Sequence, residues 1–272
     1  MPELPEVETT RRGLEPLIVG RRIRALRVRE RRLRQPIPRD LEALLAGTAV
    51  TGIARRAKYL LLETECGNAL IHLGMSGSLR VVNEELPPTP HEHYDLLLDG
   101  GHVLRYRDPR RFGLLLWAGN EPERHPLLAR LGPEPLGPDF DGAYLYRASR
   151  DRRAPVKAFL MDSRIVAGIG NIYANEALYA AGIHPRRAAG RIGATRYMLL
   201  TEAIRTVLIE AIAAGGTTLR DFVAAKGNPG YFRIRLAVYD RAGADCPRCG
   251  TPIRRSVIAQ RATYYCPRCQ RY

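Results

Sequence analysis

A proline stands directly after the initiator methionine, and a carboxylate follows it. Removal of Met1 would leave the secondary amine of Pro2 at the amino terminus, beside Glu3. An α-amino group has a pKa of about 7.7–8.0, so roughly a tenth of it is neutral and nucleophilic at pH 7. An amine that attacks a sugar carbon can form an iminium, which withdraws electrons strongly. The sequence therefore predicts a nucleophile at Pro2, on the condition that Met1 is removed.

The same segment also fits an ordinary helix start. Pro5 suits the first turn of a helix, and the acidic residues that follow it suit the helix dipole. Apolar residues at helical spacing predict a helix over about 5–17. Both interpretations can hold together, because a rigid helix would keep Pro2 and Glu3 in place.

Four cysteines near the carboxyl end form two Cys-x2-Cys pairs. Cys246 and Cys249 make the first pair and Cys266 and Cys269 the second, with sixteen residues between the pairs. This spacing predicts one structural Zn²⁺, bound by four thiolates on a β-hairpin. Disulfides are the alternative, but they conflict with a reducing cytoplasm. Cys66 lies far away along the chain and is predicted to be a free thiol.

A glycine-containing turn precedes one of the expected helices. Gly168-Ile169-Gly170-Asn171 leads into a helix predicted over about 171–181. Glycine lets the backbone approach an anion closely, and a helix N-terminus offers free N–H groups. Asn171 can cap the helix or bind a phosphate, and Lys157 lies on another predicted helix, over about 155–162. An ordinary turn between helices is the alternative.

Composition indicates a globular protein with a polyanionic partner. The chain has 272 residues, of which 45% are hydrophobic, and a formal net charge of +15. Residues 1–146 hold 21 basic and 20 acidic side chains, whereas residues 147–272 hold 22 and 8. Such an excess in one half favours nucleic acid as the partner. The chain shows neither a membrane-length apolar run nor a signal peptide, so we expect a cytoplasmic protein.

Different elements are expected in the two halves. Short strands separated by turn residues fill 22–118 and predict a sandwich or flattened barrel. The stretch 119–142 is rich in proline and glycine and indicates a connecting region. Helices follow, the last over about 195–214, and the cysteine pairs end the chain.

Taken in order, these motifs resemble the bacterial formamidopyrimidine-DNA glycosylases along essentially the whole chain. The matching segments are PELPEVET at 2–9, RRAKYLLLE at 55–63, IHLGMSGSLR at 71–80, RYRDPRRFG at 105–113, LGPEPL at 131–136, KAFLMD at 157–162, GIGNIYANEALYAAGIHP at 168–185, GGTTLRDF at 215–222 and QRATYYCPRCQ at 260–270.

The resemblance implies an α+β multidomain fold. An N-terminal β-sandwich with an N-terminal helix would form a catalytic domain over 1–133, followed by a linker over 134–150. A helix–two-turns–helix DNA-binding domain would occupy 151–236, and a four-cysteine zinc finger 237–272. Double-stranded DNA would bind between the domains of a monomer, associated with the nucleoid. The implied activity is excision of 8-oxoguanine and formamidopyrimidines, followed by β,δ-elimination at the abasic site, with one structural Zn²⁺ and no catalytic metal.

The resemblance also implies roles for individual residues. Pro2 matches the nucleophile, Glu3 the acid that protonates the sugar oxygen, and Lys58 the lysine of proton transfer in β-elimination. Arg261 matches the finger arginine of the δ-elimination step. The residues implied to contact DNA are His91, Arg110, Arg152, Lys157 and Asn171, although many relatives carry lysine at the position of Arg152.

Three of the implied DNA contacts would fill the gap that an extruded nucleotide leaves. Met75, Arg110 and Phe112 match this set, in which Arg110 would bond the orphaned cytosine. Extrusion needs an apolar wedge and a donor for the unpaired base. The segment 217–231 resembles the loop that recognises the lesion.

Two other functions stay open on the sequence alone. An endonuclease VIII-type glycosylase for oxidised pyrimidines would share Pro2, Glu3, Lys58 and the finger, but it typically begins Pro-Glu-Gly-Pro, where this chain has Pro-Glu-Leu-Pro. A non-catalytic zinc-ribbon DNA-binding protein would explain the charge and the finger. It would leave Pro2, Glu3 and Lys58 without a shared role.

Overall fold

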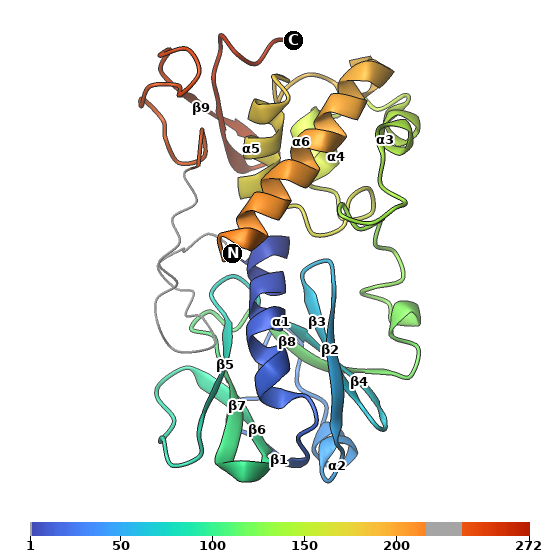
Figure 1. Cartoon of the computed structure of the whole chain (residues 1–272), viewed down its shortest axis with the longest axis vertical. Coiled ribbons are helices and arrows are strands. Elements are labelled where there is room, and N and C mark those ends of the chain that lie inside the picture. Colours follow the sequence, from blue (N-terminus) through green and yellow to red (C-terminus); the bar gives the residue numbers. More distant parts are fainter. Residues whose placement is uncertain (1, 216–235) are drawn as a thin grey trace. The chain divides into compact units, whose positions relative to one another are not determined.

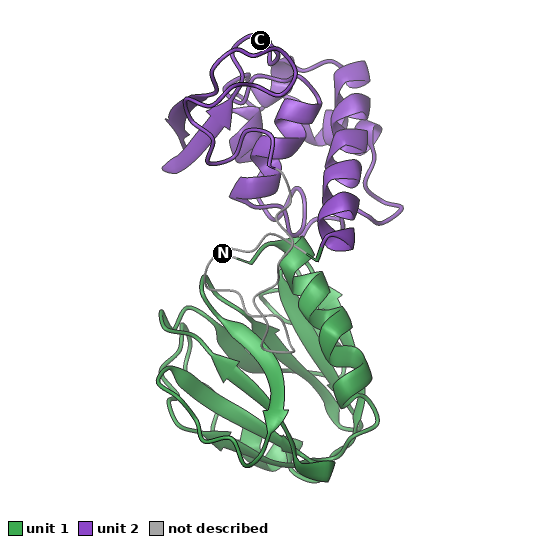
Figure 2. Cartoon of the chain, turned by 60° about the vertical axis from the view of Figure 1, so that its left-hand side comes forward, with its two compact units in different colours: residues 1–129, 215–232 green, residues 130–214, 233–272 purple. Residues whose placement is uncertain are grey.

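The computed structural model describes residues 2–215 and 236–272, which divide into two compact units near residue 130. In the described part, unit 1 comprises residues 2–129 with Gly215, and unit 2 comprises 130–214 and 236–272 (Figure 2). Within the same part, no helix is long and apolar enough to cross a membrane.

Unit 1 contains two four-stranded antiparallel sheets that share one hydrophobic core (Figure 1). Leucine-rich strands fill this core, and one of them, β6 (Glu92–Leu98), is buried at every position. The expected sandwich is therefore confirmed. In spatial order the first sheet comprises β1 (Ile23–Val28), β6 (Glu92–Leu98), β7 (His102–Arg107) and β5 (Ser78–Asn83). The second comprises β2 (Val50–Arg56), β3 (Tyr59–Thr64), β4 (Gly67–His72) and β8 (Leu114–Gly119).

The N-terminal helix α1 (Leu4–Ile18) packs against β2, β3 and β5. Its apolar stripe, which includes Val7 and Leu14, is fully buried in the core of the sandwich. The helix ends where Val19 turns extended and Gly20 adopts a φ of +83°. The predicted helix over 5–17 is therefore confirmed. A shorter helix, α2 (Leu41–Leu45), and two 3₁₀ turns, η1 (Asp99–Gly101) and η2 (Pro122–Arg124), complete unit 1.

Unit 2 is a helical bundle around the long helix α6 (Ala194–Ala213), which packs on α3 and α5. The helices predicted over 155–162, 171–181 and 195–214 are present. Helix α3 begins where the proline- and glycine-rich stretch over 119–142 ends, and it falls in the linker expected over 134–150, so it was not predicted. The Asp141 carboxylate caps it by accepting from Tyr144 N at 2.6 Å. The other helices are α3 (Gly142–Ser149), α4 (Val156–Leu160), α5 (Asn171–Ala180) and the 3₁₀ turn η3 (Ala189–Arg191).

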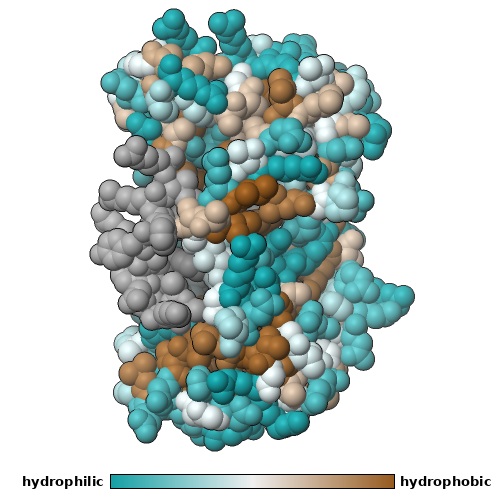
Figure 3. Space-filling view, in the orientation of Figure 1, coloured by the Kyte–Doolittle hydropathy of each residue, from teal (hydrophilic) through white to brown (hydrophobic). Residues whose placement is uncertain are grey.

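A two-stranded hairpin, β9 (Arg254–Ile258) and β10 (Arg261–Tyr265), ends unit 2. Its two turn residues, Ala259 and Gln260, have φ of 48° and 58°. Two successive positive φ values match the twist of a two-residue hairpin. The face of the molecule in Figure 3 is mostly hydrophilic, with apolar patches between the polar side chains.

Candidate functional site

The amino-terminal residues are held by the start of α1. Pro2 and Glu3 are both buried, and Glu3 N donates a hydrogen bond to Glu6 Oε2 at 2.8 Å. This contact belongs to a capping box, which satisfies the unpaired N–H groups of a helix start. Pro5 occupies the first turn, as expected. The helix therefore fixes the backbone that carries Pro2 and Glu3.

An ion pair ties the first turns of α1 to strand β2. Glu8 Oε2 accepts from Arg55 Nε at 3.0 Å, and each side chain is only 12% exposed. Burial acts to raise the pKa of Glu8, but hydrogen bonds from the surrounding arginines outweigh it and hold the pKa below its usual value. Arg55 also donates to Ala57 O, so the pair connects α1 with the turn that follows β2.

Lys58 lies on that turn, between β2 and β3. Ala57 adopts a φ of 54°, which turns the chain sharply before the partly buried Lys58. Arg55 therefore links the turn that carries Lys58 to α1, the helix that begins directly after Pro2 and Glu3.

His72 on β4 lies beside this turn and was not found from the sequence. Burial, together with the positive charges of Lys58 and Arg34, lowers the pKa of His72 to about 4. The imidazole is therefore neutral near pH 7, and its Nδ1 accepts a hydrogen bond from Gly74 N at 2.9 Å. This bond anchors the loop that carries Met75.

The structure brings together the two loops that carry Met75, Arg110 and Phe112. Gly74 has a φ of +71°, and a Cβ there would lie 2.6 Å from Gly113 N, so the loop backbones touch. The Arg110 guanidinium stacks over the Phe112 ring, 4.9 Å from its centroid. Phe112 is 43% exposed and Arg110 is exposed, while Met75 is partly buried. An exposed aromatic ring under a cation suits a surface that meets DNA bases.

His91 lies on a third loop of unit 1, just before β6. It is exposed and adopts a φ of 71°, a conformation that is uncommon outside glycine. Its carbonyl accepts from Asp108 N at 2.9 Å, next to the Arg110 loop. Three of the loops predicted to contact DNA therefore meet in unit 1.

In unit 2, the glycine turn leads into α5, with one correction. Gly168 has a φ of +82°, and Gly170 caps the helix, so Asn171 is the first helical residue and not the cap. Asn171 Oδ1 is buried without a hydrogen-bond partner in the described structure. Arg152 is exposed on the segment between α3 and α4.

Lys157 on α4 is fully buried, and its described contacts reach the hairpin. Nζ donates to Ala262 O at 2.8 Å and to Thr263 Oγ1 at 2.7 Å. Asn175 on α5, which the sequence did not single out, accepts from Tyr264 N at 2.8 Å. These contacts fix β10 directly after the exposed Arg261, which begins that strand.

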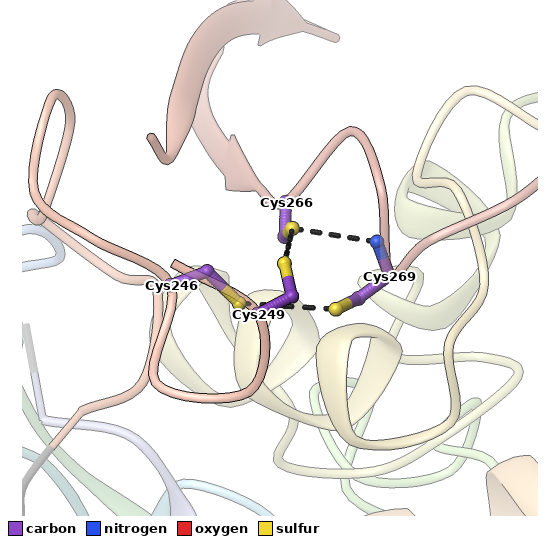
Figure 4. A group of neighbouring side chains, drawn as sticks. All are labelled: Cys246, Cys249, Cys266 and Cys269. Carbon is purple, nitrogen blue, oxygen red and sulfur yellow. Dashed lines mark hydrogen bonds between the residues drawn. The ribbon is translucent and has the colours of Figure 1, made fainter. Parts of the chain in front are cut away.

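The four cysteines form one cluster at the base of the hairpin (Figure 4). Their sulfur atoms all lie within 4.8 Å of one another. Sγ of Cys246 is 3.8 Å from that of Cys269, and Sγ of Cys249 is 3.5 Å from that of Cys266. Tetrahedral Zn²⁺ with bonds of about 2.3 Å separates its sulfur ligands by about 3.8 Å, so the cluster fits one zinc ion.

The zinc cluster is joined to helix α5. Tyr179 OH lies 3.3 Å from Cys246 Sγ, and the Arg248 guanidinium stacks on the Tyr179 ring at 4.6 Å. All four ligand positions come from the protein, so the zinc is structural and leaves no open position for catalysis.

Cys66 is exposed and free, as predicted. The segment predicted to recognise the lesion, 217–231, lies outside the described residues.

Three family models match the chain in order. A formamidopyrimidine-DNA glycosylase N-terminal domain matches residues 1–115, and the H2TH domain of the same enzymes matches 131–223. A zinc finger found in FPG and IleRS matches 245–271. The matches follow the sandwich, the helical bundle and the hairpin.

Similar proteins cover the whole chain. Formamidopyrimidine-DNA glycosylases of Methylococcus capsulatus and Alkalilimnicola ehrlichii are each 60% identical over 100% of this chain and 100% of their own length. The crystal structure of the MutM (Fpg) protein from Thermus thermophilus has a TM-score of 0.89 at 42% identity, covering 99% of this chain and 98% of that one. Lactococcus lactis Fpg in complex with DNA containing an abasic site has a TM-score of 0.91 at 33% identity, with full coverage of both chains.

Proposed function

Because the chain belongs to the formamidopyrimidine-DNA glycosylase family, we propose that it excises oxidised purines from duplex DNA through a Schiff base on Pro2. It is a base-excision repair glycosylase with one structural zinc, and its partner is damaged DNA. Solved relatives bind DNA with an abasic site or with Fapy-dG. Since the substrate is bacterial DNA, the enzyme acts in the cytoplasm, and we place it at the nucleoid.

We assign the first chemical steps to the capped amino terminus. The Pro2 nitrogen forms a bond to C1′ of the damaged nucleotide, and the glycosidic bond breaks with its electron pair leaving on the base. The nitrogen gives its N–H proton to the departing base, which restores its lone pair. Glu3 delivers a proton to the sugar oxygen, the ring opens, and this lone pair forms the C1′ iminium. The observation that carries this assignment is the capping box between Glu3 and Glu6, which holds Glu3 at the start of α1 directly after Pro2, in the unit that also contains Lys58.

The strand is then cut by two eliminations. The iminium acidifies the C2′ proton, Lys58 transfers that proton, and the 3′ phosphate leaves in the β step. A second elimination releases the 5′ phosphate, and Arg261 on the hairpin tip assists this δ step. Lys157 and Asn175 support this role of Arg261, because both hold β10 beside it.

We assign DNA contacts to both units. In unit 1, Met75, Arg110 and Phe112 fill the gap left by the extruded nucleotide, and His91 contacts the backbone nearby. In unit 2, we assign Arg152 and Asn171 to the phosphates, and Asn171 would bind through its Nδ2 donor because Oδ1 is a buried acceptor. Lys157 is fully buried and donates to the hairpin, so we assign it to DNA binding through the position of β10. We also propose the domain division 1–133, 134–150, 151–236 and 237–272, which the change of unit near residue 130 supports.

Borohydride trapping tests the proposal. The protein without Met1, checked by mass spectrometry, is expected to form a covalent adduct with a duplex that carries one 8-oxoguanine opposite cytosine. Pro2→Gly should abolish the adduct, and an undiminished adduct in this variant would contradict the role of Pro2. A duplex with thymine glycol serves as comparison, since preferential trapping there would favour the endonuclease VIII-type specificity.

A further inference from the structure

We propose that Asp108, on the loop after β7, is a positioning residue that fixes the three DNA-contacting loops of unit 1; this inference rests on the function proposed above. Its side chain is 0% exposed. A carboxylate offers about four acceptor sites, and here four donors, three from two loops and one from β7, fill them. Asp108 was not singled out from the sequence.

Three of the four donors lie on the two loops that carry Met75, Arg110 and Phe112, and the fourth lies on β7. Oδ1 accepts from Ser76 Oγ at 2.8 Å and from Arg110 N at 3.2 Å. Oδ2 accepts from Gly113 N at 2.9 Å and from Tyr106 OH at 3.1 Å. Ser76 directly follows Met75, while the Arg110 and Gly113 amides bracket Phe112. One carboxylate therefore ties the two wedge loops to each other.

The backbone of Asp108 connects the third loop. Asp108 N donates to the carbonyl of His91 at 2.9 Å, and Asp108 O pairs with Nε2 of the buried His93 at 2.7 Å. All three loops that carry predicted DNA contacts of unit 1 thus meet at a single residue.

The carboxylate is held by donors alone. Among the ion pairs of the described residues, none involves Asp108. Burial, and then the charge of Asp108 itself, raises the pKa of Tyr106, so that phenol stays protonated and donates. A buried charge without a counter-ion is costly unless every acceptor site is filled. The loops therefore keep the one arrangement that supplies all four donors.

This arrangement suits the wedge, because side chains that enter a base stack must be held against the force of restacking. Covalent chemistry at an abasic site in a single strand needs no wedge. Loss of the hydrogen bonds to Asp108 should therefore reduce base excision from duplex DNA. Formation of the Schiff base on a single-stranded abasic site should be unaffected.

Asp108→Asn is the sharpest variant. The hydroxyls of Ser76 and Tyr106 can rotate to accept from the new amide, but the Arg110 and Gly113 N–H groups cannot. Whichever way the amide turns, its NH2 faces one of these backbone donors. We expect kcat/KM for excision of 8-oxoguanine opposite cytosine to fall about 10- to 100-fold. Borohydride trapping on a single-stranded abasic oligonucleotide should stay within about 3-fold of wild type.

Asp40→Asn is the matched control, since Asp40 is exposed in the same unit and its side chain makes no capping hydrogen bond to α2. A fluorescent cytosine analogue opposite the lesion reports the unstacking step directly. Its signal should be lost in Asp108→Asn and kept in Asp40→Asn. Fluorescence of Trp117, the only tryptophan, reports whether unit 1 is folded.

The outcomes separate the two proposals. The positioning role would be overturned if Asp108→Asn excised 8-oxoguanine as fast as wild type, or if its activity fell equally on duplex and single-stranded substrates. Either result would leave the proposed function intact. A wild-type protein inert on both substrates would overturn both. If Asp108→Asn does not fold, Ser76→Ala and Tyr106→Phe each remove one donor. Both should then weaken duplex excision selectively, and an unaffected pair would overturn the proposal.

Discussion

His72 is a single side chain whose protonation state affects the stability of unit 1. Its neutral ring accepts from Gly74 N, so it supports the Met75 loop while the positive charge of Lys58 lies near it. The sequence places His72 on a strand within a matching segment but gives no sign of its protonation state. That state depends on burial beside Tyr59 and on the nearby charges of Lys58 and Arg34, which only the fold brings together.

Titration of His72 predicts a pH-dependent stability. The folded pKa of about 4 lies below the unfolded value of 6.5, so its contribution is full above pH 6.5 and is lost as the pH falls toward 4. At about 1.4 kcal/mol per pKa unit, the free energy of unfolding should drop by up to about 3 kcal/mol across this window. Urea unfolding followed by Trp117 fluorescence at several pH values measures the drop.

Two variants separate the titration of His72 from its hydrogen bond. His72→Asn and His72→Gln both remove the proton site and should flatten the pH dependence. An asparagine oxygen can replace Nδ1 toward Gly74 N, whereas glutamine reaches too far, so His72→Gln should be less stable at pH 8 by about 1 kcal/mol. A wild-type slope in either variant would contradict this account.

Among elements, α1 was the one best predicted from the sequence. Apolar spacing and Pro5 gave its bounds to within a residue, because both signals are local. Its partner was not predictable, since the Glu8–Arg55 pair joins residues 47 positions apart. The cap of α5 was misassigned to Asn171 because Gly170, in extended conformation, takes that place.

Glu8→Gln tests the connection between α1 and β2. The variant removes the carboxylate charge to which Arg11, Arg12 and Arg55 all donate, so unit 1 should lose about 1–3 kcal/mol of stability at pH 7. The folded pKa of Glu8 lies below 4.5, so its contribution is present above pH 4.5 and is lost as the pH falls through the folded pKa. The gap between variant and wild type should therefore close in acid. A gap that persists at pH 2 would assign the loss to packing.

The spacing of the four cysteines was enough to predict the zinc site and its hairpin. Substitution of one of these cysteines should therefore reduce the zinc content. Cys249→Ser removes a ligand, so the zinc content should fall well below one per chain and duplex binding should weaken at least about 10-fold. Cys66→Ser is the matched control, because that thiol is exposed and outside the cluster. Elemental analysis of the purified variants decides the point, and normal zinc in Cys249→Ser would contradict the assigned site.

For the whole molecule, composition predicted the partner better than the architecture. The excess of positive charge in residues 147–272 predicted nucleic acid as the partner. Helix α3 was missed because it follows a proline- and glycine-rich stretch and was assigned to the linker over 134–150. The order of the strands in the sheets was not predicted either, since β1 pairs with β6 and β4 with β8 across long stretches of chain. Such pairings depend on tertiary packing and leave no local signal.

Two exposed arginines, Arg152 and Arg110, should contribute to DNA binding in different ways. Arg152 is exposed in the strongly basic half and should neutralise a phosphate, whereas Arg110 lies over Phe112 and should meet the orphaned base. Each phosphate contact contributes about 0.9 to the slope of log K against log salt. Arg152→Gln should therefore reduce the slope by about 1 and weaken lesion-containing and undamaged duplexes alike.

Arg110→Gln should behave in the opposite way. Its salt slope should stay near that of wild type, while the preference for cytosine opposite the lesion should fall by about 1–3 kcal/mol, because the lost contact is to a base edge. Fluorescence anisotropy at several salt concentrations, on duplexes with each opposite base, measures both quantities for both variants. Equal slope changes in the two variants would mean that Arg110 also serves a phosphate, and its place in the wedge would then be wrong.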